Sequence, residues 1–257
     1  HILEDLGSPA ERISCLGPET AAMRTFSDLN MVILKPNPGV HNRPVLCPGM
    51  PDEAFVHENG LITKAEVRAV TLSRLQLFDQ AVFWDLGAGS GAISIEAGSR
   101  ILQGQIFAVE KEPSRVRQIE ENQKRFGVAN LGIVTARLPE GLSDLPDPDR
   151  VFVGGGGKDI GDIVHAAAIR LSPGGILVVN TVLMDSLMAA RQALTELGFS
   201  VDLIQIQVNQ AVPMPFSFRF SPANPVWILT GRKVGESHKD EGWPHVEDRL
   251  TNLFSCN

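Results

Sequence analysis

The sequence predicts an α/β fold, a doubly wound and mostly parallel sheet with helices on both faces. Three observations indicate it. Between about residues 81 and 197, short apolar runs alternate with longer amphipathic stretches, as in repeated βα units. A glycine-rich turn at residues 87–91 follows the first of these runs. The run Ile176–Val179 is apolar throughout, as expected of a strand covered on both faces.

The elements are expected in the following order. Thr63-Lys-Ala-Glu66 has the pattern of a capping box, in which Thr63 caps a helix that runs to about Leu77. Parallel strands are predicted at five apolar runs, each followed by a helix: residues 81–86, 105–110, 132–135, 150–153 and 175–181. Two more strands, 199–208 and 225–233, form a C-terminal antiparallel strand pair. The residues between them, rich in Pro and Phe, are expected to form a long functional loop.

Composition shifts divide the chain into three parts. Residues 1–45 form a separate block that ends in a linker rich in Pro and Gly, beginning at Lys35-Pro-Asn-Pro-Gly39. Residues 46–233 form the α/β domain, and residues 234–257 form a polar tail. The chain starts with His and has no signal-peptide pattern, so it is interpreted as a fragment of a longer protein.

Composition excludes several classes of protein. The 257 residues are 43% hydrophobic and 21% charged, and no apolar run approaches the ~20 residues that span a bilayer. The net charge of −7 disfavours nucleic-acid binding, which depends on Lys and Arg contacts to phosphates. Three separated cysteines form no C-x-x-C pair, which argues against disulfides and a thiolate metal site. We therefore expect a cytoplasmic protein with no membrane, nucleic-acid or metal partner.

A nucleotide site is predicted where the first strand of the domain ends. The glycines of Asp85-Leu-Gly-Ala-Gly-Ser-Gly91 lie where the backbone must turn sharply and approach a ligand closely. Glu110 ends the next strand, where its carboxylate can accept hydrogen bonds from both ribose hydroxyls. The predicted cofactor contacts here are Asp85, Gly87, Ala88, Gly89, Ser90, Gly91 and Glu110.

The glycine motif alone leaves the nucleotide open. The series Gly87, Gly89 and Ala92 also satisfies a loose dinucleotide fingerprint, and the glycines could simply form a tight turn. The tighter series Gly87, Gly89 and Gly91 after an acid is typical of methyltransferases, and too little chain remains for a hydride-transfer half. S-adenosyl-L-methionine is therefore the expected cofactor, on a class I, Rossmann-like methyltransferase fold.

A family resemblance rests on four motifs in a characteristic order. They are Pro51-Asp-Glu-Ala-Phe-Val-His57, Gly60-Leu-Ile-Thr-Lys-Ala-Glu-Val-Arg68, the glycine motif, and Val151-Phe-Val-Gly-Gly-Gly156. Together they resemble the C-terminal module of the precorrin-6Y methyltransferase (decarboxylating) family of cobalamin biosynthesis. The resemblance covers residues 48–233. Residues 3–12 and 26–30 resemble the last stretch of the tetrapyrrole methylase module that precedes it in that family, so the opening block is interpreted as its remnant.

The resemblance implies methylation of the bridging carbon 15 of a precorrin, coupled to decarboxylation of the ring C acetate. The preceding module would methylate carbon 5. It also implies cofactor contacts at Thr63 and after the third strand, where Ala136-Arg137 replaces the common Gly-Asp pattern. Backbone groups around Arg137 and Leu138 are therefore expected to bind the adenine. The family implies a homo-oligomer, with a tetramer as the expected form.

Substrate contacts are expected at the same edge of the sheet. Gly155 and Gly156 would leave room for a flat macrocycle, Asn180 closes the fifth strand, and Arg219 would meet a substrate carboxylate. Lys64 and Arg68 are further candidates for such carboxylate contacts. The sequence identifies no catalytic acid or base.

Two other functions remain as alternatives. A nucleic-acid base methyltransferase could share the fold, but Gly154–Gly157 stand where amino-group methylases carry Asn-Pro-Pro-aromatic. A non-catalytic nucleotide-binding module would bind the cofactor and catalyse no reaction.

Overall fold

The computed structural model describes residues 1–35, 45–58 and 60–234. The chain divides into two compact units, His1–Pro44 and Val45–Asn257. Apart from Val234, the polar tail expected from the sequence lies outside the described residues, as does most of the linker. That residues 1–45 are the remnant of a larger module stays a prediction. The part of the chain that the structure describes contains no helix of the length and apolarity needed to cross a membrane.

The first unit is a small antiparallel sheet of order β2-β1-β3. Its strands are β1 (Ile2–Glu4), β2 (Arg12–Ser14) and β3 (Asn30–Val32), with the short helix α1 (Pro18–Ala22) between the last two. Glu4 is buried and accepts hydrogen bonds from Arg12 Nε at 2.9 Å and from the Ser27 N–H at 3.0 Å. These donors lower the pKa of Glu4 to about 2.

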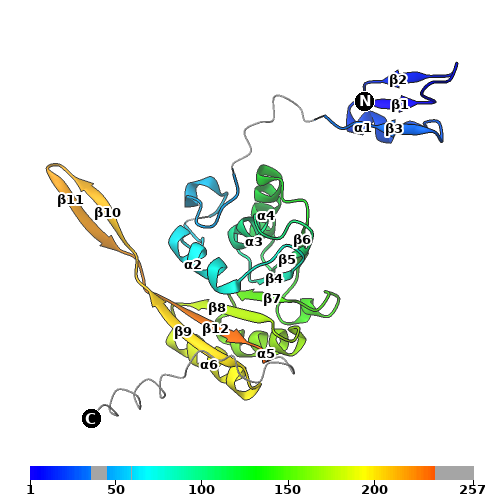
Figure 1. Ribbon diagram of the computed structural model, residues 1–257. Coiled ribbons are helices and arrows are strands. Elements are labelled where there is room, and N and C mark those ends of the chain that lie inside the picture. The colour runs from blue at the N-terminus through cyan, green and yellow to red at the C-terminus, as the bar shows by residue number, and fades with distance from the viewer. Residues whose placement is uncertain (36–44, 59, 235–257) are drawn as a thin grey trace, which may run out of the picture. The chain divides into compact units, whose positions relative to one another are not determined.

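The second unit is built on a seven-stranded sheet of order β6-β5-β4-β7-β8-β12-β9 (Figure 1). Its strands are β4 (Val82–Leu86), β5 (Gln105–Glu110), β6 (Leu131–Thr135), β7 (Arg150–Val153), β8 (Ile176–Thr181), β9 (Ser200–Ile206) and β12 (Val226–Arg232). The first five are parallel, and β12 runs antiparallel to β8 and β9. The predicted fold is confirmed, and each of the five parallel strands starts within one residue of its predicted start.

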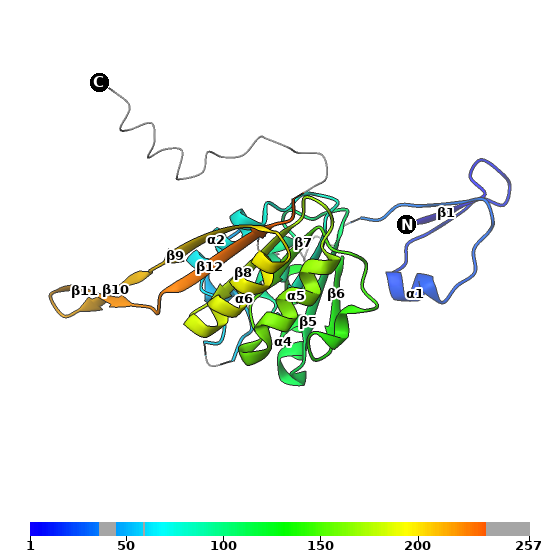
Figure 2. The same ribbon diagram turned by 90° about the horizontal axis from the view of Figure 1, so that it is seen from below.

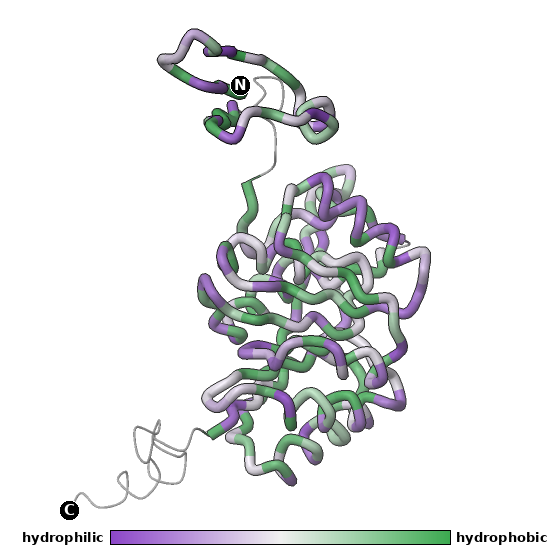
Figure 3. The backbone as a smooth tube through the Cα atoms, turned by 90° about the vertical axis from the view of Figure 1, so that its right-hand side faces the viewer, coloured by the Kyte–Doolittle hydropathy of each residue, from purple (hydrophilic) through white to green (hydrophobic). Residues whose placement is uncertain are grey.

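Helices cover both faces of this sheet. One face carries α2 (Ala65–Leu75), α3 (Ala92–Ala97) and α4 (Pro113–Phe126), which pack with Phe83, Phe152 and Val178. The other carries α5 (Ile160–Arg170) and α6 (Met184–Glu196), which lie side by side in Figure 2 and pack with Trp84 and Leu177. Three short 3₁₀ turns, η2 (Asp52–Ala54), η3 (Glu140–Leu142) and η4 (Gly157–Asp159), lie in the connections. The inner strands are strongly apolar (Figure 3), as two-sided burial requires.

The predicted capping box does not form. Helix α2 begins at Ala65, the residue before it, Lys64, is extended, and no side chain caps the first turn. Thr63 lies one residue too early, and its carbonyl oxygen accepts a hydrogen bond from Arg68 Nη1 instead. The helix also ends at Leu75 rather than Leu77, because Gln76 adopts a left-handed conformation with φ of 49°.

The expected long loop between the last two strands is a β-hairpin. Strands β10 (Asn209–Met214) and β11 (Ser217–Pro222) pair in antiparallel register and extend away from the seven-stranded sheet (Figure 1). The loop prediction was wrong because Pro-rich segments usually avoid sheets. Here both strands are edges, where proline is tolerated.

Candidate functional site

The carboxyl ends of the parallel strands meet at one edge of the sheet. Leu86 of β4 is in register with Val109 of β5 on one side and with Val153 of β7 on the other. Val153 is in turn in register with Val179 of β8. The glycine loop (residues 87–91), Glu110, the turn 154–157 and Asn180 therefore follow neighbouring strands at the edge where such sheets bind ligands.

Backbone hydrogen bonds fix the glycine loop. The N–H groups of Gly87 and Ala88 both donate to Val109 O, at 2.9 and 3.1 Å. The loop then turns at Gly89, whose φ is +59°, and a side chain there would meet no atom within 4 Å. The loop thus leaves open space above Gly89, where a ligand can approach the backbone.

Gly87 is where the glycine loop touches the turn after β7. Its φ is +73°, and a Cβ added there would lie 3.0 Å from both the Cα and the N atom of Gly155. Both contacts are backbone atoms, so no side chain can move aside. The two glycines together let the β4 and β7 loops approach closely.

We expect Gly87→Ala to destabilise the protein by more than about 1 kcal/mol and to weaken nucleotide binding. Gly174→Ala is the matched control, since Gly174 also has φ of +73° but no atom lies within 4 Å of its added Cβ. Urea denaturation of both variants separates the steric contact from the backbone strain. Equal losses of stability would show that the contact with Gly155 contributes nothing.

Glu110 is held by backbone donors at the tip of β5. Its Oε2 accepts a hydrogen bond from the Gly89 N–H at 2.9 Å, and its Oε1 accepts from the N–H groups of Lys111 and Glu112 at 2.9 and 3.1 Å. The residue is only 4% exposed. The acid predicted from the sequence therefore lies directly beside the glycine loop, and an ionised carboxylate still has acceptor capacity for a hydroxyl group.

Asp85, one of the predicted cofactor contacts, lies beneath the glycine loop and is fully buried. Its Oδ2 accepts hydrogen bonds from the Ser94 hydroxyl at 2.5 Å and the Ser94 N–H at 3.1 Å. It thus binds an N–H group in the first turn of α3 and supports the start of that helix. Burial raises the pKa of Asp85 to about 7, against the two bonds from Ser94.

This shift predicts a pH dependence of stability. The native carboxyl keeps its proton up to a pH near 7, whereas an ordinary Asp ionises at 3.8, so between these values the native state binds more protons. The free energy of unfolding should fall as pH rises from about 4 to 7, by up to about 1.4 kcal/mol per pH unit. Asp85→Asn should lack this pH-dependent part of the free energy of unfolding, as measured by urea denaturation at several pH values. The same pH dependence in both proteins would contradict the raised pKa of Asp85.

The remaining predicted cofactor residues lie on three segments of the second unit. Thr63 is half-buried just before α2, and Ala88, Ser90 and Gly91 complete the glycine loop. Arg137 and Leu138 follow β6, next to the end of β5. The Arg137 side chain is exposed and pairs with Asp159 at 3.3 Å. That its backbone contacts the cofactor stays a prediction.

The predicted substrate residues have different surroundings. Gly155 packs on Gly87, and a side chain at Gly156 would meet Ile160 and Ile163. Asn180 Nδ2 donates to Thr71 Oγ1 at 2.7 Å, and its Oδ1 is buried with no partner among residues 1–35, 45–58 and 60–234. Arg219 is exposed on β11, in a hairpin that continues from β9 and β12 at this edge of the sheet.

Arg68 is the centre of a buried network and cannot reach a substrate. Its Nε donates to Glu96 Oε1 and its Nη1 to Asp52 Oδ1, both at 2.7 Å, and the side chains of Arg68 and Glu96 are fully buried. It also donates to the carbonyl oxygens of Met50 and Thr63. The network therefore holds the segment before α2, residues 49–58 and 60–63, here called the strap.

Glu96 and Asn122 hold the same strap and were not predicted from the sequence. Glu96 accepts hydrogen bonds from the N–H groups of Gly49 at 2.7 Å and Met50 at 3.0 Å. Asn122 contacts the strap at Val56. A signal was available for Glu96, since a charged residue inside an apolar run on a helix is usually paired.

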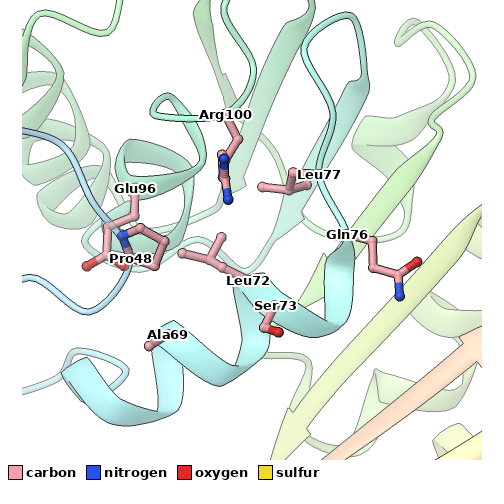
Figure 4. A pocket seen from close by; sticks show the side chains of 8 residues that line it. All are labelled: Pro48, Ala69, Leu72, Ser73, Gln76, Leu77, Glu96 and Arg100. Atoms are coloured by element: carbon pink, nitrogen blue, oxygen red, sulfur yellow. The ribbon is translucent and has the colours of Figure 1, made fainter.

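A cavity of about 350 Å³ lies elsewhere, between α2 and α3 (Figure 4). It is lined by Pro48, Ala69, Leu72, Ser73, Gln76, Leu77, Glu96 and Arg100. No residue of the glycine loop lines it. Within the described residues, no cluster of three or more His, Cys, Asp or Glu side chains could hold a metal ion.

Comparison with known proteins gives a consistent result. The family model described as "Precorrin methyltransferase domain" matches residues 53–233. The probable cobalt-precorrin-6B C(15)-methyltransferase (decarboxylating) of Pyrobaculum calidifontis is 39% identical over 190 residues, which cover 73% of this chain and 97% of that protein. The precorrin-6Y C(5,15)-methyltransferase [decarboxylating] of a Sinorhizobium species is 36% identical over 233 residues, 89% of this chain and 55% of that protein.

A solved structure agrees with the sequence relatives. The crystal structure of precorrin-6y C5,15-methyltransferase from Geobacter metallireducens matches with a TM-score of 0.70 and 43% identity. The match covers 74% of this chain and all of that chain.

Proposed function

Because the chain belongs to the precorrin methyltransferase family, we propose that it methylates carbon 15 of a precorrin and decarboxylates the ring C acetate, in cobalamin biosynthesis. The methyl donor is S-adenosyl-L-methionine. The observation that carries the proposal is the pairing of the glycine loop with Glu110, which accepts a hydrogen bond from the Gly89 N–H at 2.9 Å. A nucleoside fits there, because the backbone is open at Gly89 and a carboxylate stands at the neighbouring strand end.

The proposed role of the residues named here is to bind the methyl donor and to orient it. Glu110 would accept hydrogen bonds from the ribose, Gly87–Gly91 would follow the amino-acid part of the donor, and the backbone at Arg137 and Leu138 would meet the adenine. Thr63 would contact the donor from the strap. When bound, the donor supplies an electrophilic methyl group, so the protein's part is mainly positioning. Positioning alone can contribute about 7–11 kcal/mol to lowering a barrier.

The decarboxylation also needs little from the protein. Loss of the acetate carboxyl group as carbon dioxide leaves an electron pair, which the conjugated macrocycle accepts before a proton is added. Gly155, Gly156, Asn180 and Arg219 are the proposed substrate contacts. Arg219 is exposed at the ligand-binding edge, where a cation can pair with a substrate carboxylate.

Binding of the donor can be tested without substrate. At a concentration of S-adenosylhomocysteine 100-fold above its Kd, the fold should be stabilised by about 2.7 kcal/mol, with a matching rise in the melting temperature. NAD should produce no shift. A shift with NAD and none with S-adenosylhomocysteine would overturn the cofactor assignment.

The β10–β11 hairpin supports the proposal of a homo-oligomer. Phe218 and Phe220 are two residues apart on β11 and therefore share one face of it. They pair with Pro213 and Ala211 of β10. They are 73% and 72% exposed. An isolated two-stranded hairpin is only marginally stable in water, and exposed apolar faces of this kind mark interfaces. A second copy of the chain would bury this face.

We expect the wild-type protein to be oligomeric in light scattering, with a tetramer as the proposed form. Replacing both Phe218 and Phe220 by Ser should reduce the assembled mass. Leu102→Ser is the matched control, because Leu102 is also 72% exposed but lies outside the hairpin. An unchanged mass for the double variant would place the interface elsewhere.

A further inference from the structure

The strap is held at its two ends by side chains of α2 and α3. Glu96 of α3 binds the N–H groups of Gly49 and Met50, and Arg68 of α2 binds the carbonyl oxygen of Thr63. In the middle of the strap, Phe55 is buried and packs on Phe126 of α4, with ring centroids 5.0 Å apart. The backbone of the next residue, Val56, is bound by another group.

Asn122 of α4 holds that middle part. Its Oδ1 accepts a hydrogen bond from the Val56 N–H at 2.8 Å, and its Nδ2 donates to Val56 O and to Ser90 O, both at 2.9 Å. The two backbone oxygens can only accept and the N–H can only donate, so the orientation of the amide is fixed. The side chain is fully buried. A single side chain thus joins the strap to the glycine loop.

We propose that Asn122 is a positioning residue for the cofactor site. It holds the strap on the glycine loop, so that Thr63 and the loop are arranged before the cofactor binds. This inference rests on the proposed function, which places the cofactor at that loop. Without Asn122, part of the binding free energy would be used to order the strap, and affinity would fall.

The test compares Asn122→Ala with Gln123→Ala. Gln123 is the next residue of α4 and donates to the carbonyl oxygens of Val128 and Leu131, at 3.1 and 2.6 Å. Both variants lose side-chain hydrogen bonds to the backbone, but only Asn122 touches the strap. Asn122→Ala should raise the Kd for S-adenosylhomocysteine about tenfold, and Gln123→Ala should leave it within about twofold. Asn122→Ser replaces Asn122→Ala if the latter does not fold.

Hydrogen exchange at the Val56 amide provides a readout that needs no ligand. It should be faster in the Asn122 variant than in wild type, and unchanged in Gln123→Ala. Equal exchange rates, or equal affinities in the Asn122 and Gln123 variants, would overturn the positioning role. A wild-type protein that binds no S-adenosylhomocysteine, with faster Val56 exchange in the Asn122 variant, would instead overturn the proposed function and leave the hold on the strap established.

Discussion

Glu110→Ala should weaken the binding of S-adenosylhomocysteine about 100-fold in isothermal titration, while the protein stays folded. The carboxylate is proposed to accept hydrogen bonds from the ribose, and a bond to a charged group contributes about 1.5–3 kcal/mol. Two such bonds, less the adjustment of the site, give about 3 kcal/mol, or roughly 100-fold. The variant also leaves the Gly89 N–H without its acceptor, because in the wild-type protein this group donates to Glu110 at 2.9 Å.

Two further variants make this result specific. Glu121→Gln removes an acid from the exposed face of α4 and should leave the affinity unchanged. Glu110→Gln keeps the shape but places an NH₂ group beside either Gly89 or the donors Lys111 and Glu112. Its affinity should lie near that of Glu110→Ala. An affinity for Glu110→Ala equal to wild type would remove Glu110 from the ribose site.

Arg68→Met should lower the free energy of unfolding by about 3–5 kcal/mol in urea denaturation. Arg68 and Glu96 are both fully buried, and removing the cation leaves the carboxylate of Glu96 without a cationic partner. Asp52 loses one of its two cations and keeps Lys64 at 3.1 Å. The carbonyl oxygens of Met50 and Thr63 also lose their donor. The strap would therefore loosen together with the loss of stability.

Arg74→Met is the matched control on the same helix. Arg74 pairs with Asp202 at 2.7 Å, the same distance as in the buried pair, but its side chain is 34% exposed and that of Asp202 is 60% exposed. Solvent screens such a pair, so its loss should cost less than about 1 kcal/mol. Comparable losses in the two variants would show that burial is not what makes the Arg68 network important.

The sheet could be predicted because its signals are local. Each parallel strand is an apolar run bounded by turn residues, and Ile176–Val179 has no polar residue to obscure it. The start of α2 could not be predicted in the same way. Thr63 and Glu66 have the spacing of a capping box, but Arg68 binds Thr63 O, and this tertiary contact overrides the local preference. The hairpin was missed because Pro213 and Pro222 suggested a loop.

The candidate site could be predicted only for functional residues that directly follow or end a strand. The positions of the glycine loop and Glu110 follow directly from the strand order, since neighbouring parallel strands end at the same edge. Asp85 and Arg68 were also candidate site residues in the sequence, and in the structure both are buried and hydrogen-bonded within the protein. Asn122 gave no signal, because its partners Val56 and Ser90 are 66 and 32 residues away in the chain.

The mass of the reaction product shows whether this protein both methylates and decarboxylates a precorrin. The protein is incubated with S-adenosyl-L-methionine and a precorrin that retains the ring C acetate, and the tetrapyrrole is analysed by mass spectrometry. We expect a product that has gained one methyl group and lost one carbon dioxide, with Glu110→Ala forming it far more slowly. A tetrapyrrole of unchanged mass, from wild-type protein that binds S-adenosylhomocysteine, would show that the protein does not catalyse this reaction.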